Sequence, residues 1–397
     1  MTRLGFLEAR ALVIESILQA RAVPGVEEVA LGEAAGRVLA VDVAADRDAP
    51  AVDRSARDGY AVRAAEVPGS LAVIGEVRAG GRFGGVVGPG QAVEIMTGAP
   101  VPAGADAVVM VEHTRAEDGR VQIDGSVQPG QAINRRGVDA MAGEIVLDAG
   151  TRLDYSGIAA LAAFGHARVA VYRRPVVAIV ATGDELVEVE EAPAEFQIRN
   201  SNAWSLAVQV SRAGGTPLIS VARDTVEHTR LLLGRGIEAA DLLLVSGGVS
   251  AGKYDVVEKA LASLGAQFYF DRVPIQPGQP LVFGRARGKF FFGLPGNPAS
   301  TMVTFEVFAR AALELLGGQR ETALAMPWAR LTREFRHRPG LTRFLPAFLG
   351  SDGADVTPVD WHGSGDVPAL TRANAFLVAE PDHAVYAAGE WIRVLLK

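Results

Sequence analysis

The spacing of hydrophobic residues changes character along the chain. Between residues 50 and 150, short apolar runs alternate with glycine and proline, as in "SLAVIGEV" (70–77), "QAVEIM" (91–96) and "DAVVMVEH" (106–113). Short strands with closely spaced turns predict a small β-barrel or sandwich in this region. Helical spacing flanks it. Residues 1–20 predict an amphipathic surface helix, and residues 154–165 predict a helix that Gly165 ends.

From residue 175 onward, predicted strands and helices alternate. "PVVAIVAT" (175–182) is a continuous apolar run, as in buried parallel strands. The pattern as a whole predicts an open α/β sheet, whose ligands bind at the carboxyl ends of the strands. The further expected elements are a helix in "NSNAWSLAVQVSRAGG", a strand in "TPLISVA", a helix over 225–239, a strand in "DLLLVSGG", a helix over 254–264, a strand in "KFFFGLPGNP" and a long helix reaching "ELLGG". A break at "AMPWA" (325–329) begins a last β-rich segment without helical period.

Length and composition exclude several classes of protein. The chain has 397 residues, which is enough for several hydrophobic cores. It contains no cysteine, so disulfides, zinc–thiolate sites and cysteine nucleophiles are excluded. No apolar run is long enough for a membrane span, and no secretory signal opens the chain, so we expect a cytoplasmic protein. The net charge of −7 argues against nucleic-acid binding.

Three unusual loops follow strands of the predicted α/β sheet: "TGDEL" (182–186), "SGGVSAGKYD" (246–255) and "LPGNP" (294–298). In the third, Asn297 can cap the next helix and Pro298 suits its first turn. The second loop nearly matches a phosphate-binding P-loop, but Tyr254 stands where that motif needs Ser or Thr on Mg²⁺. The next residue, Asp255, can hold a hard cation through oxygen. A P-loop is therefore disfavoured, and an anion-and-metal loop remains open.

Each loop also has an ordinary explanation. A glycine-rich turn between a strand and a helix is common, and Asp255 can simply stabilise a helix N-terminus. Together, however, the loops belong around a single crevice, because the carboxyl ends of parallel strands meet at one edge of a sheet. Glu185 and Asp255 would then be two carboxylates near a bed of backbone amides, which suits Mg²⁺ bridging to phosphate.

Motifs along almost the whole chain resemble one family. They are "SARDGYAV" (55–62), "IMTGAPVPAGADAVVMVE" (95–112), "RRGVDAMAGE" (135–144), "ATGDEL", "SGGVSAGKYD", "IQPGQP" (275–280), "LPGNPAS" and "GSGDVPALTRANAFLV" (363–378). In this order they are similar to the molybdopterin molybdenumtransferases, the MoeA and gephyrin E-domain family, which insert molybdate into molybdopterin.

The resemblance implies an elongated homodimer of four-domain chains. Its expected domains are a linker and dimerisation domain (1–48 and 142–174), an inserted β domain (49–141), an α/β domain that binds molybdopterin nucleotide (175–325) and a C-terminal β domain (326–397). The implied substrates are adenylylated molybdopterin and molybdate, with release of AMP. Transient contact with the molybdopterin adenylyltransferase is also implied, whereas nucleic acid and membrane are not.

The resemblance also nominates site residues. Glu185 and Asp255 would hold Mg²⁺, Asp224 would lie at the nucleotide end, and the partner subunit would present its β domain. Molybdate would be handled near the third loop and the last domain. The residues carried over are Asp58, Thr97 and Asp139 from the partner's β domain, Gly247, Gly248 and Ser250 around the phosphates, and Pro295, Pro298, Ser300, Gln276, Gln279, Arg343 and Ser364 around substrate and molybdate.

The sequence departs from the family pattern at "IQPGQP". Many members have lysine at one or both of the positions that Gln276 and Gln279 hold here. Glutamine donates hydrogen bonds but adds no positive charge, so the oxyanion contact is expected to be weaker. Lys253 or Arg343 would have to compensate, although Lys253 also fits a solvated residue at a helix start. A smaller departure is Arg57, which replaces methionine beside Asp58.

Two other functions fit parts of the sequence. A molybdopterin adenylyltransferase shares the α/β layer but would not need the β-rich region at 50–150 or the C-terminal domain. A non-catalytic pterin-binding scaffold is the second alternative, and the absence of a fused partner domain or disordered linker argues against it.

Overall fold

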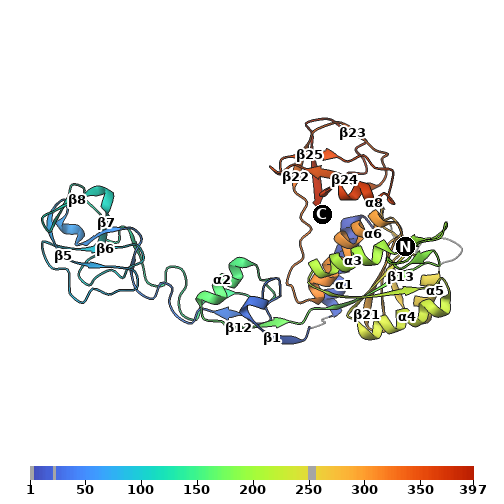
Figure 1. Cartoon of the computed structure of the whole chain (residues 1–397), viewed down its shortest axis with the longest axis horizontal. Coiled ribbons are helices and arrows are strands. Elements are labelled where there is room, and N and C mark those ends of the chain that lie inside the picture. The colour runs from blue at the N-terminus through green and yellow to red at the C-terminus, as the bar shows by residue number, and fades with distance from the viewer. Residues whose placement is uncertain (1–3, 21–23, 249–255) are drawn as a thin grey trace.

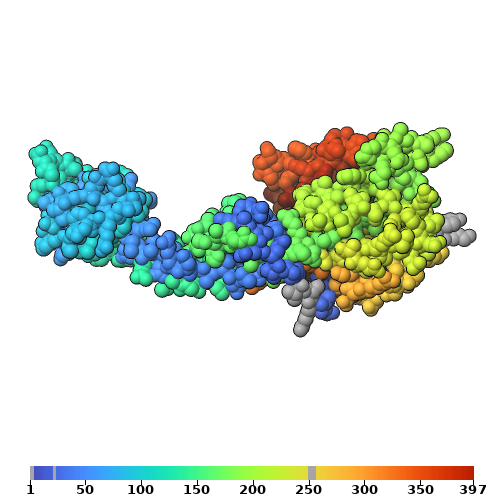
Figure 2. Space-filling view, turned by 60° about the horizontal axis from the view of Figure 1, so that its bottom comes forward, coloured from blue at the N-terminus to red at the C-terminus, as the bar shows by residue number. Residues whose placement is uncertain are grey.

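The computed structural model describes residues 4–20, 24–248 and 256–397. The molecule is elongated (Figure 1). A β-sheet body lies at one end, a small mixed body lies in the middle, and an α/β body carries the C-terminal β domain at the other end. Figure 2 shows the C-terminal domain lying against the α/β body. Among the described residues, no helix is long and apolar enough to cross a membrane.

The distal body confirms the β-rich prediction for residues 50–150. Its sheet has buried residues on both faces, since Tyr60 and Val62 belong to one hydrophobic cluster and Ala61 to the other. The sheet order is β7 (Ala107–Met110), β4 (Gly59–Val62), β6 (Gln91–Ile95), β5 (Gly69–Val77), β9 (Arg120–Ile123) and β8 (Thr114–Glu117), with the short pair β3 (Arg54–Ser55) and β10 (Ile133–Asn134) beside it.

The middle body is formed by two separate stretches of chain. The antiparallel pair β1 (Val26–Ala30) and β12 (Arg168–Tyr172) and the short pair β2 (Val43–Ala44) and β11 (Ile145–Leu147) bring them together. The predicted helix is α2 (Tyr155–Ala163). Asp154 caps it by accepting the Gly157 N–H, and Gly165 at φ +81° follows its end.

The α/β body has a central sheet with helices on both faces. Its strand order is β16 (Thr216–Ala222), β13 (Val176–Thr182), β17 (Leu242–Ser246), β21 (Lys289–Leu294), β20 (Val282–Ala286) and β18 (Gln267–Phe270). One face packs on α4 (Val226–Ala239) and α5 (Val256–Ser263). The other packs on α3 (Ser201–Arg212), α6 (Pro298–Thr304) and α7 (Arg310–Leu316).

Three features of this body were not foreseen. The sheet is parallel only from β16 to β21, because β20 and β18 join antiparallel as a hairpin edge. The predicted long helix contains a π-helical turn at Phe305–Ala309. Helix α1 (Phe6–Ala20), which the sequence grouped with the middle body, buries Ala9, Val13 and Ile17 in the α/β core. The predicted domain boundaries as a whole stay a prediction.

The C-terminal segment closes into a small barrel. Around it run β24 (Thr342–Leu349), β25 (Asp355–Pro358), β22 (Trp328–Leu331), β28 (Trp391–Leu396) and β26 (Ala375–Ala379), which pairs back to β24. A short helix, α8 (Val367–Thr371), interrupts this segment, although the sequence showed no helical period there. The strand β19 (Ile275–Gln276) of the α/β region pairs with β24 and so joins the two domains.

Candidate functional site

The described residues of the three loops singled out in the sequence, with 246–248 for the second, meet at one edge of the sheet. Strands β13, β17 and β21 are parallel neighbours, so their carboxyl ends lie side by side. A cleft of about 760 Å³ opens there, which is within the usual range for small-molecule sites. Its lining includes Thr182, Glu185, Asn202, Asp224, Ser246, Gly247, Gly248, Pro295, Asn297, Pro298 and Ser300.

Close backbone approach explains the two glycines of the second loop. Gly247 has φ +93°, and a Cβ atom on it would lie 2.7 Å from the carbonyl oxygen of Thr182. Gly248 has φ +64°, and its Cβ would lie 2.9 Å from Thr182 Oγ1. Any larger residue would push the first two loops apart. The Gly247 N–H donates to the Leu294 carbonyl at 3.2 Å, whereas Gly248 is exposed and keeps its backbone at the cleft surface, where an anion can reach it.

Buried polar atoms without partners mark the cleft floor. Thr182 Oγ1 and Asn202 Oδ1 are buried and find no hydrogen-bond partner among the described residues. The Asn202 amide nitrogen donates to Ser246 Oγ at 3.0 Å and to the Gly296 carbonyl at 2.6 Å, so the side chain is held between two loops. Unpaired buried acceptors are costly, and in a cleft they are natural contacts for a ligand.

Sequence reasoning missed Thr182 and Asn202. The sequence signal that could have identified them was their position at the end of a strand and at the start of a helix. Thr182 is the last residue of β13, and Asn202 lies in the first turn of α3, just after the residue that caps this helix. That cap is Asn200, whose side chain accepts the Ala203 N–H. At the next predicted cap, Asn297 occupies the capping position with Pro298 in the first turn, but its side chain makes no capping hydrogen bond.

The acidic side of the cleft is formed by the first loop and the loop after β16. Asp184 and Asp224 form a reciprocal pair of hydrogen bonds, called here the Asp184–Asp224 clasp. The Asp184 N–H donates to the Asp224 carboxylate at 3.3 Å, and the Asp224 N–H donates to the Asp184 carboxylate at 3.1 Å. The Glu185 carboxylate lies over Gly183, where an added Cβ would be 2.5 Å from Oε2. Glu185 and Asp224 thus supply exposed carboxylate oxygens to the cleft.

These donors fit a hard divalent cation in chemical type. No group of three or more His, Asp or Glu side chains converges on one point within residues 4–20, 24–248 and 256–397. The second predicted ligand, Asp255, lies outside the described residues, as do Ser250 and Lys253.

A second pocket, of about 310 Å³, adjoins the cleft and shares Pro280 and Ser300 with it. The β19–β24 pairing sets Gln276 beside Arg343. On its other side, Ala299 N–H donates to the Ser364 carbonyl at 2.9 Å and joins α6 to the C-terminal domain. The pocket therefore lies between the two domains and collects the predicted residues Gln276, Gln279, Ser300, Arg343 and Ser364.

The charge in this pocket is positive. Arg343 Nε donates to the Arg338 carbonyl at 3.2 Å. Burial lowers the pKa of Arg343, and the neighbouring Arg338 charge lowers it further. Both effects penalise the positive charge, which an arginine nevertheless keeps at neutral pH. An oxyanion in the pocket would relieve that penalty.

Asp58, Thr97 and Asp139 lie elsewhere, in or beside the distal β body and far from the cleft of the same chain (Figure 1). Asp58 Oδ1 accepts the Thr97 N–H at 2.6 Å. This bond and the Thr97 hydroxyl lower the pKa of Asp58. All three side chains are exposed, as is Arg57. The structure thus brings Asp58 and Thr97 together but does not bring them to the cleft.

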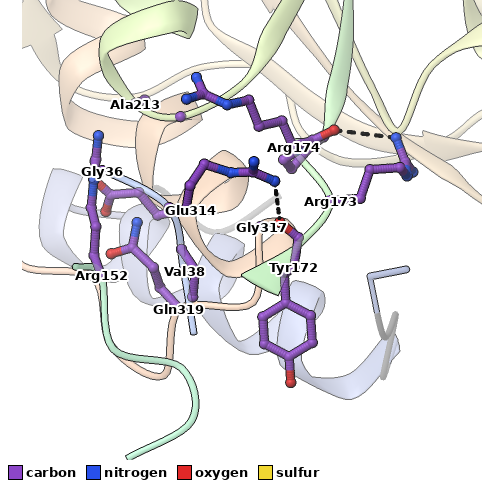
Figure 3. A pocket seen from close by; sticks show the side chains of 13 residues that line it. Gly36, Val38, Arg152, Tyr172, Arg173, Arg174, Ala213, Glu314, Gly317 and Gln319 are labelled. Atoms are coloured by element: carbon purple, nitrogen blue, oxygen red, sulfur yellow. Dashed lines mark hydrogen bonds between the residues drawn. The ribbon is translucent and has the colours of Figure 1, made fainter. Parts of the chain in front are cut away.

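A third cavity lies where the middle body meets the α/β body (Figure 3). Arg37 donates to the Tyr172 carbonyl at 2.9 Å and pairs with Glu27, while Arg152 donates to the Arg212 carbonyl at 2.7 Å. Its volume of about 10 Å³ holds no more than a water molecule. This cavity is part of a polar joint between two bodies, and it is too small for a substrate.

Comparisons with known proteins agree with this geometry. Family models match residues 5–165 as the MoeA N-terminal region (domain I and II), 178–315 as a probable molybdopterin binding domain, and 328–397 as the MoeA C-terminal region (domain IV). The chain is 37% identical over 386 residues to the molybdopterin molybdenumtransferase of Bacillus subtilis, covering 93% of this chain and 89% of that protein. It is also 37% identical to the Nostoc protein of that name, covering 93% and 88%.

A solved structure has the same fold along its whole length. The molybdopterin biosynthesis MoeA protein of Pyrococcus horikoshii OT3 aligns over 100% of both chains with a TM-score of 0.82 and 30% sequence identity. The matches extend over the distal body, the α/β body and the C-terminal barrel alike. The chain therefore belongs to the MoeA family of molybdopterin molybdenumtransferases, enzymes of molybdenum cofactor biosynthesis.

Proposed function

We propose that the chain inserts molybdate into adenylylated molybdopterin with release of AMP, assisted by Mg²⁺. One observation carries the proposal: the cleft at the strand ends opens, at Ser300 and Pro280, into the positively charged pocket between the domains. The larger cavity suits an elongated nucleotide-linked substrate. The smaller one suits a compact oxyanion beside it.

The phosphates of the adenylylated substrate belong at the Gly247–Gly248 turn. The exposed Gly248 brings a backbone N–H to the cleft with no side chain beside it. Thr182 and Asn202 lie beneath this turn with unpaired acceptor atoms. They would accept hydrogen bonds from substrate N–H or O–H groups and so fix its orientation.

Glu185 would hold the magnesium ion, with Asp255 as the second ligand predicted from the sequence. When bound, the ion would offset the negative charge of the adenylyl phosphates. The Asp184–Asp224 clasp positions Glu185 by tying its loop to the loop after β16. Asp224 itself remains available at the nucleotide end of the cleft.

Molybdate would occupy the pocket between the domains. Two anions brought together repel each other, and the repulsion grows in a site that excludes water. The Arg343 guanidinium offsets part of this cost, and Ser300 and Ser364 can donate hydroxyl hydrogen bonds. Two Mo–S bonds to the dithiolene would then form while two molybdate oxygens leave as water, taking protons from the thiols and the solvent. One water molecule would hydrolyse the phosphoanhydride bond, so that AMP leaves.

The active enzyme would be a homodimer with composite sites. Asp58, Thr97 and Asp139 cannot serve the cleft of their own chain, because the distal body lies at the other end of the molecule (Figure 1). A second copy would place its distal body over the cleft. Large apolar side chains are exposed along the middle and distal bodies, including Val41, Val138, Met141, Ile145 and Tyr155. Such residues would be covered in a dimer.

Replacement of Glu185 by glutamine should abolish magnesium-dependent turnover without unfolding the protein. Loss of metal-assisted charge neutralisation corresponds to roughly a hundredfold or more in rate. The measurement is single-turnover AMP release as a function of Mg²⁺ concentration, beside a thermal melt. Glu190→Gln, which changes an exposed carboxylate five residues further along the chain, is the control. Equal rates for the two variants at saturating Mg²⁺ would refute the metal assignment.

Replacement of Gln279 by lysine should improve molybdate binding. A new positive charge beside a dianion should lower the KM for molybdate roughly three- to tenfold at low salt, with kcat little changed. Steady-state kinetics at two ionic strengths would measure this. Gln122→Lys, on the exposed side of β9, adds the same charge in the distal body. An unchanged or raised KM for Gln279→Lys would show that molybdate binds elsewhere.

Heterodimers can test the composite site directly. A dimer of one Glu185→Gln subunit and one Asp58→Asn subunit should keep one intact site and about half of the wild-type activity. The reciprocal dimer, with both changes in one subunit and a wild-type partner, should be inactive. Differential tags allow each heterodimer to be purified before assay. The opposite pattern of activities would mean that each site is built from a single chain.

A further inference from the structure

A separate cavity lies at the opposite edge of the central sheet. Its volume is about 180 Å³, and it is lined by the amino-terminal ends of the parallel strands rather than by their carboxyl ends. Asp241 precedes β17 and Lys289 begins β21. The catalytic cleft follows the other ends of the same strands, five to seven residues away. At about 3.3 Å per residue, the two cavities are roughly 20 Å apart.

Positive charge dominates this cavity. Arg173, Arg285 and Lys289 contribute cations, and Asp241 is the carboxylate in the lining. Asp241 pairs with Arg173 at 3.0 Å and with Lys289 at 3.4 Å, and it also accepts the Val176 N–H. A surplus of two positive charges therefore remains. Although burial raises the pKa of Asp241, these partners lower it overall, so the carboxylate is already ionised near neutral pH.

Arg285 is the cation whose donors are least satisfied. Its guanidinium carbon lies 5.4 Å from the centre of the Phe290 ring, which holds the planar group in place. Its Nε atom is buried and finds no acceptor among the described residues. A buried donor without a partner is costly, and it would be satisfied by an anion in the adjoining cavity. The neighbouring Arg287, at the hairpin turn, pairs instead with Glu238.

The remaining walls restrict the size of the occupant. Ala20, Pro24, Pro175 and Leu316 form apolar sides. The cavity is smaller than most pockets for drug-sized ligands, which begin near roughly 300 Å³. It is also distinct from the water-sized joint cavity of Figure 3, with which it shares Arg173 and Pro175. A compact ion fits this space better than a nucleotide.

We propose that this cavity is a second anion site, which binds a small tetrahedral dianion of the inorganic phosphate class. Two surplus positive charges match a dianion, and the arginine and lysine donors match its oxygens. The bound ion would link three segments: the connection between β12 and β13 at Arg173, the strand β20 and the start of β21. The site is independent of the catalytic cleft and of the reaction proposed for it.

The test uses the full-length protein and inorganic phosphate as the probe. Crystals soaked in selenate, a tetrahedral anion with an anomalous signal, should show the ion beside Arg285. In calorimetric titrations with phosphate, Arg285→Gln should weaken the binding event by roughly tenfold or more, because one charge-assisted contact is lost. Arg287→Gln, which changes an arginine two residues away, should bind phosphate within about twofold of wild type. Acetate, a planar monoanion, should bind more weakly than phosphate.

Lys289→Gln provides a second route to the same answer. Its side chain is 40% exposed, so this change threatens folding less, and it too should weaken phosphate binding. A thermal melt without phosphate identifies any variant that fails to fold. The proposal is overturned if selenate does not appear beside Arg285, or if the folded variants of Arg285 and Lys289 bind phosphate as tightly as Arg287→Gln does.

Discussion

The parallel pairing of β13, β17 and β21 is the constraint on which the site depends. It brings three strand ends to one edge of the sheet, so the loops that follow these strands begin side by side. Gly247 and Gly248 then allow the second loop to approach Thr182 more closely than any side chain would permit. The backbone therefore sets the shape of the cleft, and polar side chains line it.

Two short contacts also join the cleft region to the C-terminal barrel. One short pair of strands, β19 and β24, joins the α/β body to the barrel and sets Gln276 beside Arg343. A hydrogen bond from Ala299 to Ser364 joins them again on the other side of the pocket. The two domains thus form the second pocket between them, next to Ser300. In our account this is why a nucleotide-linked substrate and an oxyanion can be held side by side.

Local patterns in the sequence predicted local structure well. The helices α2, α3 and α4 lie where helical spacing predicted them, and Asp154, Asn200 and Thr225 cap them by accepting nearby backbone N–H groups. Long apolar runs identified β13, β17 and β21. Because the carboxyl ends of parallel strands meet at one edge of a sheet, these elements together predicted the position of the cleft.

The features that could not be predicted from the sequence depend on contacts between segments far apart in the chain. The docking of α1 in the α/β core, the antiparallel β18–β20 edge and the closure of the barrel carry no local signal that separates them from alternatives. Thr182 and Asn202 were missed for the same reason. Their importance appears only when burial leaves Thr182 Oγ1 and Asn202 Oδ1 without partners. Asp255, nominated from sequence alone, lies outside the described residues and stays a prediction.

The central claim is that the carboxyl-end cleft holds the adenylylated substrate by its phosphates. A crystal structure of the chain with AMP and Mg²⁺ tests it most directly. We predict that the phosphate lies at the Gly247–Gly248 turn, against the backbone amide of Gly248, with the metal ion in contact with Glu185. A nucleotide bound at the amino-terminal edge of the sheet, or anywhere away from Gly247, would contradict it.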